Sequence, residues 1–452
     1  MSLITHGHPH RLRKQSPARV SIPTAEPLQS PEQPASPQAG IQLPKALRRM
    51  TLPEDDTPAK LRQDLLDHFH ALGLTHLSDK VGQAGLIRPE MATLDKEGIK
   101  KAHEHQRGAY LEREARMLRK NWSKFVTAFA DGDEVVPERI RPVMVPVESN
   151  SFEGDLFRFA TTLWSVPVSR GFGRRMRYLV FDEQNGKLIG LFALGDPVFN
   201  LRARDQLVGW DQAARRERLV NVMDGYIIGS VPPYSALLGG KLVTSLIGAR
   251  EVSDEFRARY CETKGIISDK EKYAQLSLVT VTSALGRSSI YNRLHLKHQG
   301  TGKSLVRLDP LGMTDGYGHF HLSEDLFARM RLMLLKMGHP YALGHQFGDG
   351  PNWRMRMIRV ALSHLGLSPN LTRHGISREV FAMPLVENYK DVLKDGKTPK
   401  KQKRPAAKDI SIAALDRWVV PRAASRPEYR EIRRDDYLKE QLDKGRSSSV
   451  LL

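Results

Sequence analysis

The chain has a single cysteine, and this scarcity excludes several kinds of site. Cys261 can form no disulfide within the chain, and a metal site built from several thiolates is excluded with it. No run of apolar residues approaches the roughly 20 that a helix needs to span a bilayer, and the first residues lack the apolar stretch of a secretory signal. We therefore expect a cytoplasmic protein without a membrane partner, in which Cys261 is an inert thiol.

The short motifs of the common hydrolases and zinc enzymes are also absent. The sequence has no G-x-S-x-G elbow, no H-E-x-x-H and no paired cysteines. The stretch GTGKSLV at 300–306 looks like a phosphate-binding loop, but the full pattern G-x-x-x-x-G-K-[ST] needs a glycine where the chain has Lys297. No activity follows from a single motif.

Acidic residues are too few to balance the basic ones. The chain has 70 Lys and Arg against 51 Asp and Glu, which gives a formal net charge of +19. Such an excess favours a polyanionic partner, and we expect nucleic acid, in the first place DNA; an acidic membrane surface is the alternative. With 40% hydrophobic residues among 452, the chain can nevertheless bury a substantial core.

Shifts in composition divide the chain into four parts. Residues 1–58 are rich in Pro, Ser, Gln and His with scattered Arg, which predicts a basic, disordered arm. Residues 59–150 carry the amphipathic patterns of a helical lead-in, except for a Pro- and Val-rich stretch at 135–147 that predicts a connection or an edge strand. Residues 151–393 form the predicted core, and residues 394–452 a solvated basic linker followed by a weakly helical tail. Both basic ends are expected to contact nucleic acid.

The core alternates strands and helices, so the predicted fold class is α/β (α+β), with a mixed sheet flanked by helices. The strongest local signal is Asn185-Gly186 between RMRYLVFD and LIGLFALGD, because this dipeptide between two β-rich segments is typical of a hairpin. A helix over DQAARRERLVNVMD, a polar helix near 254–260 and an apolar strand at 275–283 are also predicted.

The stretch 226–249, YIIGSVPPYSALLGGKLVTSLIGA, predicts a buried strand, a Pro-Pro turn and an apolar helix. Gly239 and Gly240 at the first turn of that helix would let a ligand approach the backbone, and exposed N–H groups beside Lys241 would attract an anion. The alternative is that the two glycines only let the helix pack closely on the sheet.

Polar residues are densest just after the predicted strand at 275–283. In an open α/β sheet, ligands bind at the carboxyl ends of strands, so this segment and the Gly-Gly-Lys turn are expected to meet at one cleft. The alternative is a helix cap made by a serine hydroxyl, with solvated arginines. The candidate substrate or nucleic-acid contacts here are Arg287, Ser288, Ser289, Asn292 and Arg293, and Tyr291 lies among them.

Two further groups lie nearer the C-terminus. His319 and His321 share one side of a strand-like segment, but without a visible third ligand we predict no metal. Ser323 should cap the next helix. Trp353, Arg354 and Arg356 begin a later helix, where arginines beside an aromatic side chain suit phosphate and base contacts or, alternatively, form a solvated basic face.

Several of these motifs occur together in one known family. RYLVFD, KLIGLFALGDPVFNLRARDQLVGW, VPPYSALLGGKLV, TSALGRSSIYNRL, TDGYGHFHLSEDLF, FGDGPNWRMRMIRVAL and HGISREVFAMPLVEN, in this order over 152–393, resemble the bacterial family that includes the DruA component of Druantia anti-phage systems. The resemblance implies a protein of defence islands or mobile elements that acts near foreign DNA with other defence-system proteins.

The order of elements in the core also resembles an acetyltransferase-like (GNAT) core. That resemblance implies that the turn with Gly239, Gly240 and Lys241 holds the pyrophosphate of acetyl-CoA, and that the next strand splays away to admit the substrate. Tyr291, His319 and His321 are then the catalytic candidates, since a phenol or imidazole can exchange a proton in a cleft.

Three functions follow as hypotheses. The first is a DNA-associated defence or mobile-element protein, whose basic tails contact nucleic acid while the core binds a ligand. The second is a GNAT-like acyltransferase that modifies a nucleic-acid base or a protein. The third is a non-catalytic adaptor for a helicase-like partner.

Overall fold

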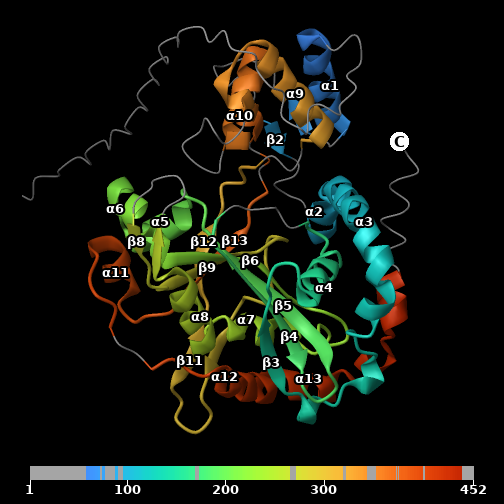
Figure 1. Ribbon diagram of the computed structural model, residues 1–452, viewed down its shortest axis with the longest axis vertical. Coiled ribbons are helices and arrows are strands. Elements are labelled where there is room, and N and C mark those ends of the chain that lie inside the picture. Colours follow the sequence, from blue (N-terminus) through green and yellow to red (C-terminus); the bar gives the residue numbers. More distant parts are fainter. Residues whose placement is uncertain are drawn as a thin grey trace, which may run out of the picture. The chain divides into compact units, whose positions relative to one another are not determined.

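The computed structural model describes residues 57–71, 74–76, 87–89, 95–167, 173–264, 271–318, 322–343, 353–372, 374, 376–400 and 403–439. Within these ranges a seven-stranded sheet lies at the centre, with helices on both faces (Figure 1). Its strand order is β12-β13-β9-β6-β5-β4-β3. The strands are β3 (Pro142–Pro146), β4 (Arg175–Asp182), β5 (Lys187–Gly195), β6 (Val222–Ser230), β9 (Leu278–Thr282), β12 (Asp309–Met313) and β13 (Glu379–Pro384).

The first half of the sheet follows the predicted hairpin. β4 and β5 pair antiparallel from Arg175↔Gly195 to Asp182↔Lys187, and Asn185-Gly186 forms their turn, so the hairpin prediction is confirmed. β3, at the stretch expected to be a connection or an edge strand, is an edge strand paired with β4. Its prolines are tolerated there because one side of an edge strand needs no ladder donors.

The middle of the sheet contains the one parallel pair among the described strands, β6 with β9. The two strands are joined by a crossover through α7 (Gly239–Leu246) and α8 (Arg250–Tyr260). Their pairing runs only from Val222↔Leu278 to Gly225↔Val281. Beyond that point β6 stays on β5 as far as Ser230, while β9 stays on β13. The two central strands therefore part.

Alternating side chains direct the two faces of the sheet toward two helical layers. On β4, Tyr178 joins the core beneath α7, α8, α12 (Ala407–Ala414) and α13 (Val420–Ser425). Its neighbour Leu179 joins the core beneath α3 (Glu104–Val126) and α4 (Phe152–Thr161). At the other end of that second face pack α5 (Arg202–Val208), α6 (Gln212–Arg218) and α11 (Tyr389–Asp395). The helix predicted over 211–224 thus ends early, and its last apolar residues begin β6.

A separate hydrophobic cluster joins α1 (Pro58–Ala71) to α9 (Glu324–Lys336) and α10 (Trp353–His364). α1 was expected in the N-terminal lead-in, yet its Leu65 is fully buried among residues far along the chain. An ion pair between Arg329 and Asp64, 2.7 Å between N and O, links α9 to α1. Ser323 caps α9 by accepting a hydrogen bond from the N–H of Leu326, as predicted.

The remaining described elements are small. α2 (Lys96–Ala102) precedes α3, and three antiparallel pairs stand apart from the main sheet: β1 (Leu74–His76) with β2 (Ile87–Pro89), β7 (Glu262–Lys264) with β8 (Glu271–Tyr273), and β10 (His295–Lys297) with β11 (Ser304–Arg307). In the described parts of the chain, each helix is too short or too polar to cross a membrane.

The C-terminal segment 403–439 differs from the expected basic linker and weakly helical tail. Many of its apolar residues are buried in the main core, among them Ile410, Ala414, Val419 and Tyr429. The side chain of Arg404 is also partly buried, and this burial lowers its pKa to about 10. The reason is tertiary: charged residues are as numerous as apolar ones here, but most of the apolar ones are spaced so that they face the core.

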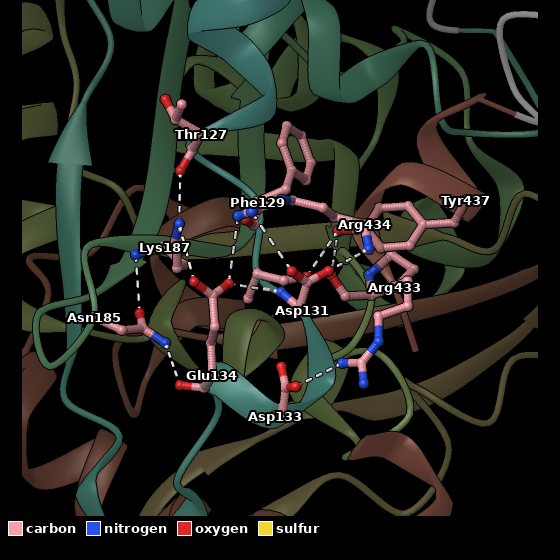
Figure 2. Close-up of polar contacts among 12 residues, drawn as sticks. Thr127, Phe129, Asp131, Asp133, Glu134, Asn185, Lys187, Arg433, Arg434 and Tyr437 are labelled. Carbon is pink, nitrogen blue, oxygen red and sulfur yellow. Dashed lines mark hydrogen bonds and ion pairs between the residues drawn. The ribbon is translucent and has the colours of Figure 1, made fainter. Parts of the chain in front are cut away.

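Hydrogen bonds and ion pairs fasten the end of this segment to the loop after α3 (Figure 2). The N–H of Arg434 donates to Asp131 at 2.7 Å, and its guanidinium lies 3.5 Å from Glu134. Arg433 pairs with Asp133 at 2.8 Å between N and O. The Tyr437 hydroxyl donates to the carbonyl of Pro232, directly after β6. The segment is thereby attached to two distant loops.

Gly132 should be required for this attachment. A Cβ at Gly132 would lie 2.0 Å from the carbonyl oxygen of Tyr429 and 2.7 Å from the backbone of Arg430. Gly132→Ala should therefore lower the free energy of unfolding by about 1–3 kcal/mol, the usual cost of overpacking. Urea unfolding measures this. Gly300→Ala is the control, since no heavy atom comes nearer than 3.6 Å, and equal midpoints for the two variants would contradict the expectation.

Candidate functional site

A cavity of about 250 Å³ lies where β6 and β9 have parted. Three segments line it: the end of β6, the residues after β9, and the connection that follows α4. A cleft between diverging strands at their carboxyl ends is where an open α/β sheet binds ligands. The lining residues are Leu163, Trp164, Ser165, Val166, Ser230, Val231, Pro232, Ala284 and Leu285.

The backbone explains why a gap forms here. The N–H of Val231 still donates to the carbonyl of Ile189 on β5 at 3.0 Å, and the N–H of Ser283 donates to the carbonyl of Glu379 on β13 at 2.8 Å. Each strand thus keeps its hydrogen bonds to its outer neighbour. Pro232 and Pro233 follow β6 and have no N–H to offer across the gap. The unfilled space between the strands is the cavity.

Trp164 forms one wall of the cavity. A Cβ on Gly229 of β6 would come within 2.5 Å of Cζ2 of the indole, so the ring lies directly against the strand. The indole N–H has no hydrogen-bond partner among the described residues, and Ser165 and Ser230 add hydroxyl groups to an otherwise apolar lining. This composition suits a small, largely apolar group that carries one or two hydrogen-bond acceptors.

Buried polar groups link α3 to the end of α4, which precedes the cavity lining. The Tyr110 hydroxyl on α3 bonds the Thr161 hydroxyl at 2.8 Å, at the end of α4 just before the cavity. At His103, the residue between α2 and α3, burial and then the charge of Arg378 lower the pKa of the imidazole to about 4. His103 is therefore neutral at pH 7, and its Nε2 lies 3.1 Å from the Arg378 guanidinium.

Asp224 marks the point where β6 and β9 begin to part. It pairs in register with Thr280, whose hydroxyl donates to its carboxylate at 2.8 Å. Burial raises the pKa of the Asp224 carboxyl, although the Thr280 hydrogen bond and the charges of Arg204 and Arg175 act in the opposite direction. Arg175 stacks on Tyr226, with its guanidinium 4.2 Å from the ring centroid.

The predicted Gly-Gly-Lys turn opens α7, and the segment 287–293 lies on it. The expectation that these two stretches meet is correct, but they meet by packing. Gly239 and Gly240 are both buried; a Cβ would lie 2.7 Å from the carbonyl oxygen of Tyr234 at the first and 3.1 Å from Ile290 at the second. The geometry thus supports close packing as the reason for both glycines, and cofactor binding there stays a prediction.

Lys241 also stabilises the contact between α7 and the segment 287–293. Its ammonium group donates to the carbonyls of Ile290 at 3.1 Å and Asn292 at 2.9 Å, and it lies 5.6 Å from the centre of the Trp418 ring. Burial, and to a smaller extent the charge of Arg417, lower its pKa. In this arrangement Lys241 holds the segment 287–293 on α7, so an anion would have to displace two carbonyl partners to reach it.

The other predicted residues near this segment fall into two groups. Tyr291 is buried, with its ring 5.6 Å from that of Phe381, and burial together with the charge of Asp224 raises its pKa. Ser288 shapes the turn by accepting a hydrogen bond from the N–H of Ile290. The remaining four, Arg287, Ser289, Asn292 and Arg293, are exposed.

The predicted residues on α10 belong to the separate helical cluster. The Arg354 guanidinium lies 3.7 Å from the centre of the Phe327 ring and donates to Glu324 at 2.7 Å. Trp353 packs edge-on against the same Phe327, and Arg356 is half-buried nearby. Trp353 and Arg354 thus join α9 to α10; their role as nucleic-acid contacts stays a prediction.

His319 and His321 lie outside the described residues. Among those described, no group of three or more His, Cys, Asp or Glu side chains could hold a metal ion. The sequence predictions missed Trp164, Gly229 and Ala284. The stretch LWSVPV gave a signal, a tryptophan before an extended Pro-containing segment, but its position against β6 depends on the tertiary fold.

Comparisons with known proteins give a consistent result. The family model described as "Druantia protein DruA" matches residues 93–395. A relative from Escherichia coli (strain UMEA 4076-1), also described as "Druantia protein DruA", is 46% identical over 373 residues, which cover 82% of this chain and 89% of the relative. No solved structure matches. The family match begins within the part expected as a helical lead-in and ends with α11.

The raised pKa of Asp224 leads to a pH-dependent stability. Below about pH 3.9, the value for an unfolded chain, the carboxyl is protonated in both states and its burial adds no ionisation cost. In the folded state the pKa of Asp224 is higher, so folding becomes less favourable as the pH rises from the unfolded-state pKa to the folded-state pKa. Above the folded-state pKa the full cost of ionising the buried carboxyl is present. Asn at this position does not titrate and can still accept the Thr280 bond.

For Asp224→Asn, the free energy of unfolding relative to that of the natural chain should therefore increase with pH and then level off. Urea unfolding at intervals from pH 4 to pH 8 measures the difference. A difference that stays constant over this range, or that falls with pH, would show that Asp224 is not destabilised by ionisation in the fold.

Proposed function

The chain belongs to the DruA family of Druantia proteins, and from this membership we propose that it acts in anti-phage defence as a DNA-associated protein whose core binds a ligand. The observation that carries the ligand-binding part is the cavity between the parted strands β6 and β9. A protein that served only as a scaffold would not need such a gap, because closing it would add hydrogen bonds and buried area.

The DNA-associated part of the proposal rests on charge. The net charge of +19 is large for one chain and favours a polyanion. The arm 1–58, which lies almost wholly outside the described ranges, and the basic stretch at 395–408 are proposed as nucleic-acid contacts together with exposed basic residues of the core. Other proteins of the same defence system are the proposed protein partners.

A GNAT-like acyltransferase is the second candidate function, with acetyl-CoA as its cofactor. The strand arrangement favours it: antiparallel strands lead to a central strand, a helix follows, and the next strand is parallel and splays away. We rank it second because Ile290 and Tyr234 cover the first turn of α7, where the cofactor pyrophosphate was expected. A non-catalytic adaptor comes third, since it would not use the cavity.

Filling the cavity should abolish protection against phage. Ala284 is exposed at the cavity rim, so Ala284→Phe adds bulk where ligand must enter without burying a strained side chain. Ala424→Phe on α13 is the matched control, because it adds the same bulk to another exposed alanine. In bacteria that carry the natural locus of this chain, the plaque count should rise at least about tenfold with the first variant and stay unchanged with the second. Equal protection by both variants would contradict a function of the cavity.

Acetyl-CoA should stabilise the purified protein if the acyltransferase candidate is correct. At ten times its Kd a ligand adds about 1.4 kcal/mol to the free energy of unfolding, which differential scanning fluorimetry detects as a rise in Tm. Ala284→Phe should remove this rise, and Ala424→Phe should retain it. The absence of a rise at millimolar acetyl-CoA would exclude the acyltransferase and leave the first proposal standing.

A further inference from the structure

The stretch 284–308 has an unusual charge distribution. Over 25 residues it contains no Asp or Glu, although the whole chain has 51 of them. Its Lys and Arg residues are Arg287, Arg293, Lys297, Lys303 and Arg307. The fold places the second half of this stretch in the β10–β11 hairpin, which stands apart from the seven-stranded sheet and projects past α12 (Figure 1).

The hairpin has one buried and one exposed face. Leu296 and its partner Val306 are buried in the main core, at 0% and 4% exposure. The side chains on the other face are exposed, and they come from both strands: His295, Lys297, Ser304 and Arg307. Because side chains alternate along a strand, the apolar pair fixes which face the basic residues take.

The hairpin is held firmly in place. Val306 lies so close to the end of α7 that a Cβ on Gly248 would be 2.8 Å from its Cγ2 atom. Beside the loop that joins the strands, the Gln299 amide donates to Asp416 at 2.9 Å. The exposed face is thus presented by a fixed ribbon, so binding to it costs little conformational entropy.

Most of its cations have no acidic partner. Arg307 pairs with Asp309 at 3.2 Å between N and O. Within the described ranges, Arg287, Arg293, Lys297 and Lys303 take part in no ion pair. Lys241, in contrast, is turned inward to backbone carbonyls. Four uncompensated cations are therefore distributed along the ribbon and the turn that precedes it.

We propose that the exposed face of the β10–β11 hairpin, together with the loop that joins its strands, binds the phosphate backbone of duplex DNA. A two-stranded antiparallel ribbon has the right width for the major groove. Lys297 on β10 and Lys303, in the loop directly before β11, are both exposed and can reach phosphates on the groove walls. Gly300 and Gly302 leave the tip of the ribbon without bulk, which permits close approach. This surface rests on the proposed DNA association but not on the cavity.

The salt dependence of binding tests the surface. With a fluorescein-labelled duplex of about 20 base pairs, fluorescence anisotropy over a series of NaCl concentrations gives the slope of log K against log salt. Each lost phosphate contact should reduce the magnitude of that slope by about 0.9. Lys297→Gln combined with Lys303→Gln should therefore reduce it by about 1.8 and weaken binding at least about tenfold at 0.1 M salt.

Two control variants isolate the effect of position and of charge. Lys120→Gln with Lys336→Gln removes the same charge from exposed positions on α3 and α9, so its slope should equal that of the natural chain. Lys297→Arg with Lys303→Arg keeps the charge and should keep the slope. All four positions are exposed, so each double variant should unfold at the same temperature as the natural chain.

The outcomes separate this surface from the proposed function. If the natural chain binds duplex DNA and the hairpin variant behaves like the α3 and α9 control, the hairpin proposal is overturned while DNA association stands. If the natural chain does not bind duplex DNA, both are overturned. If poly-glutamate displaces the duplex as effectively as unlabelled DNA does, the hairpin serves an acidic protein partner instead, and the proposal is again wrong.

Discussion

The structure depends on how β6 and β9 divide their hydrogen bonds. The two strands pair in parallel over four residues each, and beyond Gly225 and Val281 each keeps only its outer neighbour. The outer pairings, β6 with β5 and β9 with β13, continue through the same region, so each strand stays in the sheet by its outer ladder while its inner edge faces the gap. The sheet is therefore continuous on both sides of the opening, and the cavity is a consequence of that division.

The elements around the gap are fixed by packing and by buried polar contacts. On one face Lys241 and Ile290 hold the segment 287–293 on α7, which places the polar residues after β9 beside that helix. On the other face Trp164 rests against Gly229. The C-terminal segment is hydrogen-bonded to the loop after α3 (Figure 2). It is also hydrogen-bonded to Pro232, so it holds the chain in place just after β6.

The basic residues fall into two groups, those that pair with acidic residues and those that do not. Acidic partners neutralise the arginines that join elements, such as Arg329, Arg354 and Arg434. The basic residues of the β10–β11 hairpin have only one such partner in the described ranges, that of Arg307. The hairpin has an apolar pair on one side and cations on the other. Packing of the apolar pair in the core fixes the position of the ribbon, and the cations stay exposed to water.

The sequence by itself determined several local elements: the β4–β5 hairpin from Asn185-Gly186, the start of α7 after two prolines and the cap of α9 by Ser323. These depend on residues a few positions apart, so their patterns are readable along the chain. Only the tertiary structure decided that α1 shares a core with α9 and α10, that residues 403–439 belong to the core, and that Gly239 and Gly240 are covered. It also decided the cavity, because the gap depends on which strands become neighbours across more than fifty residues, and local patterns carry no information about that choice.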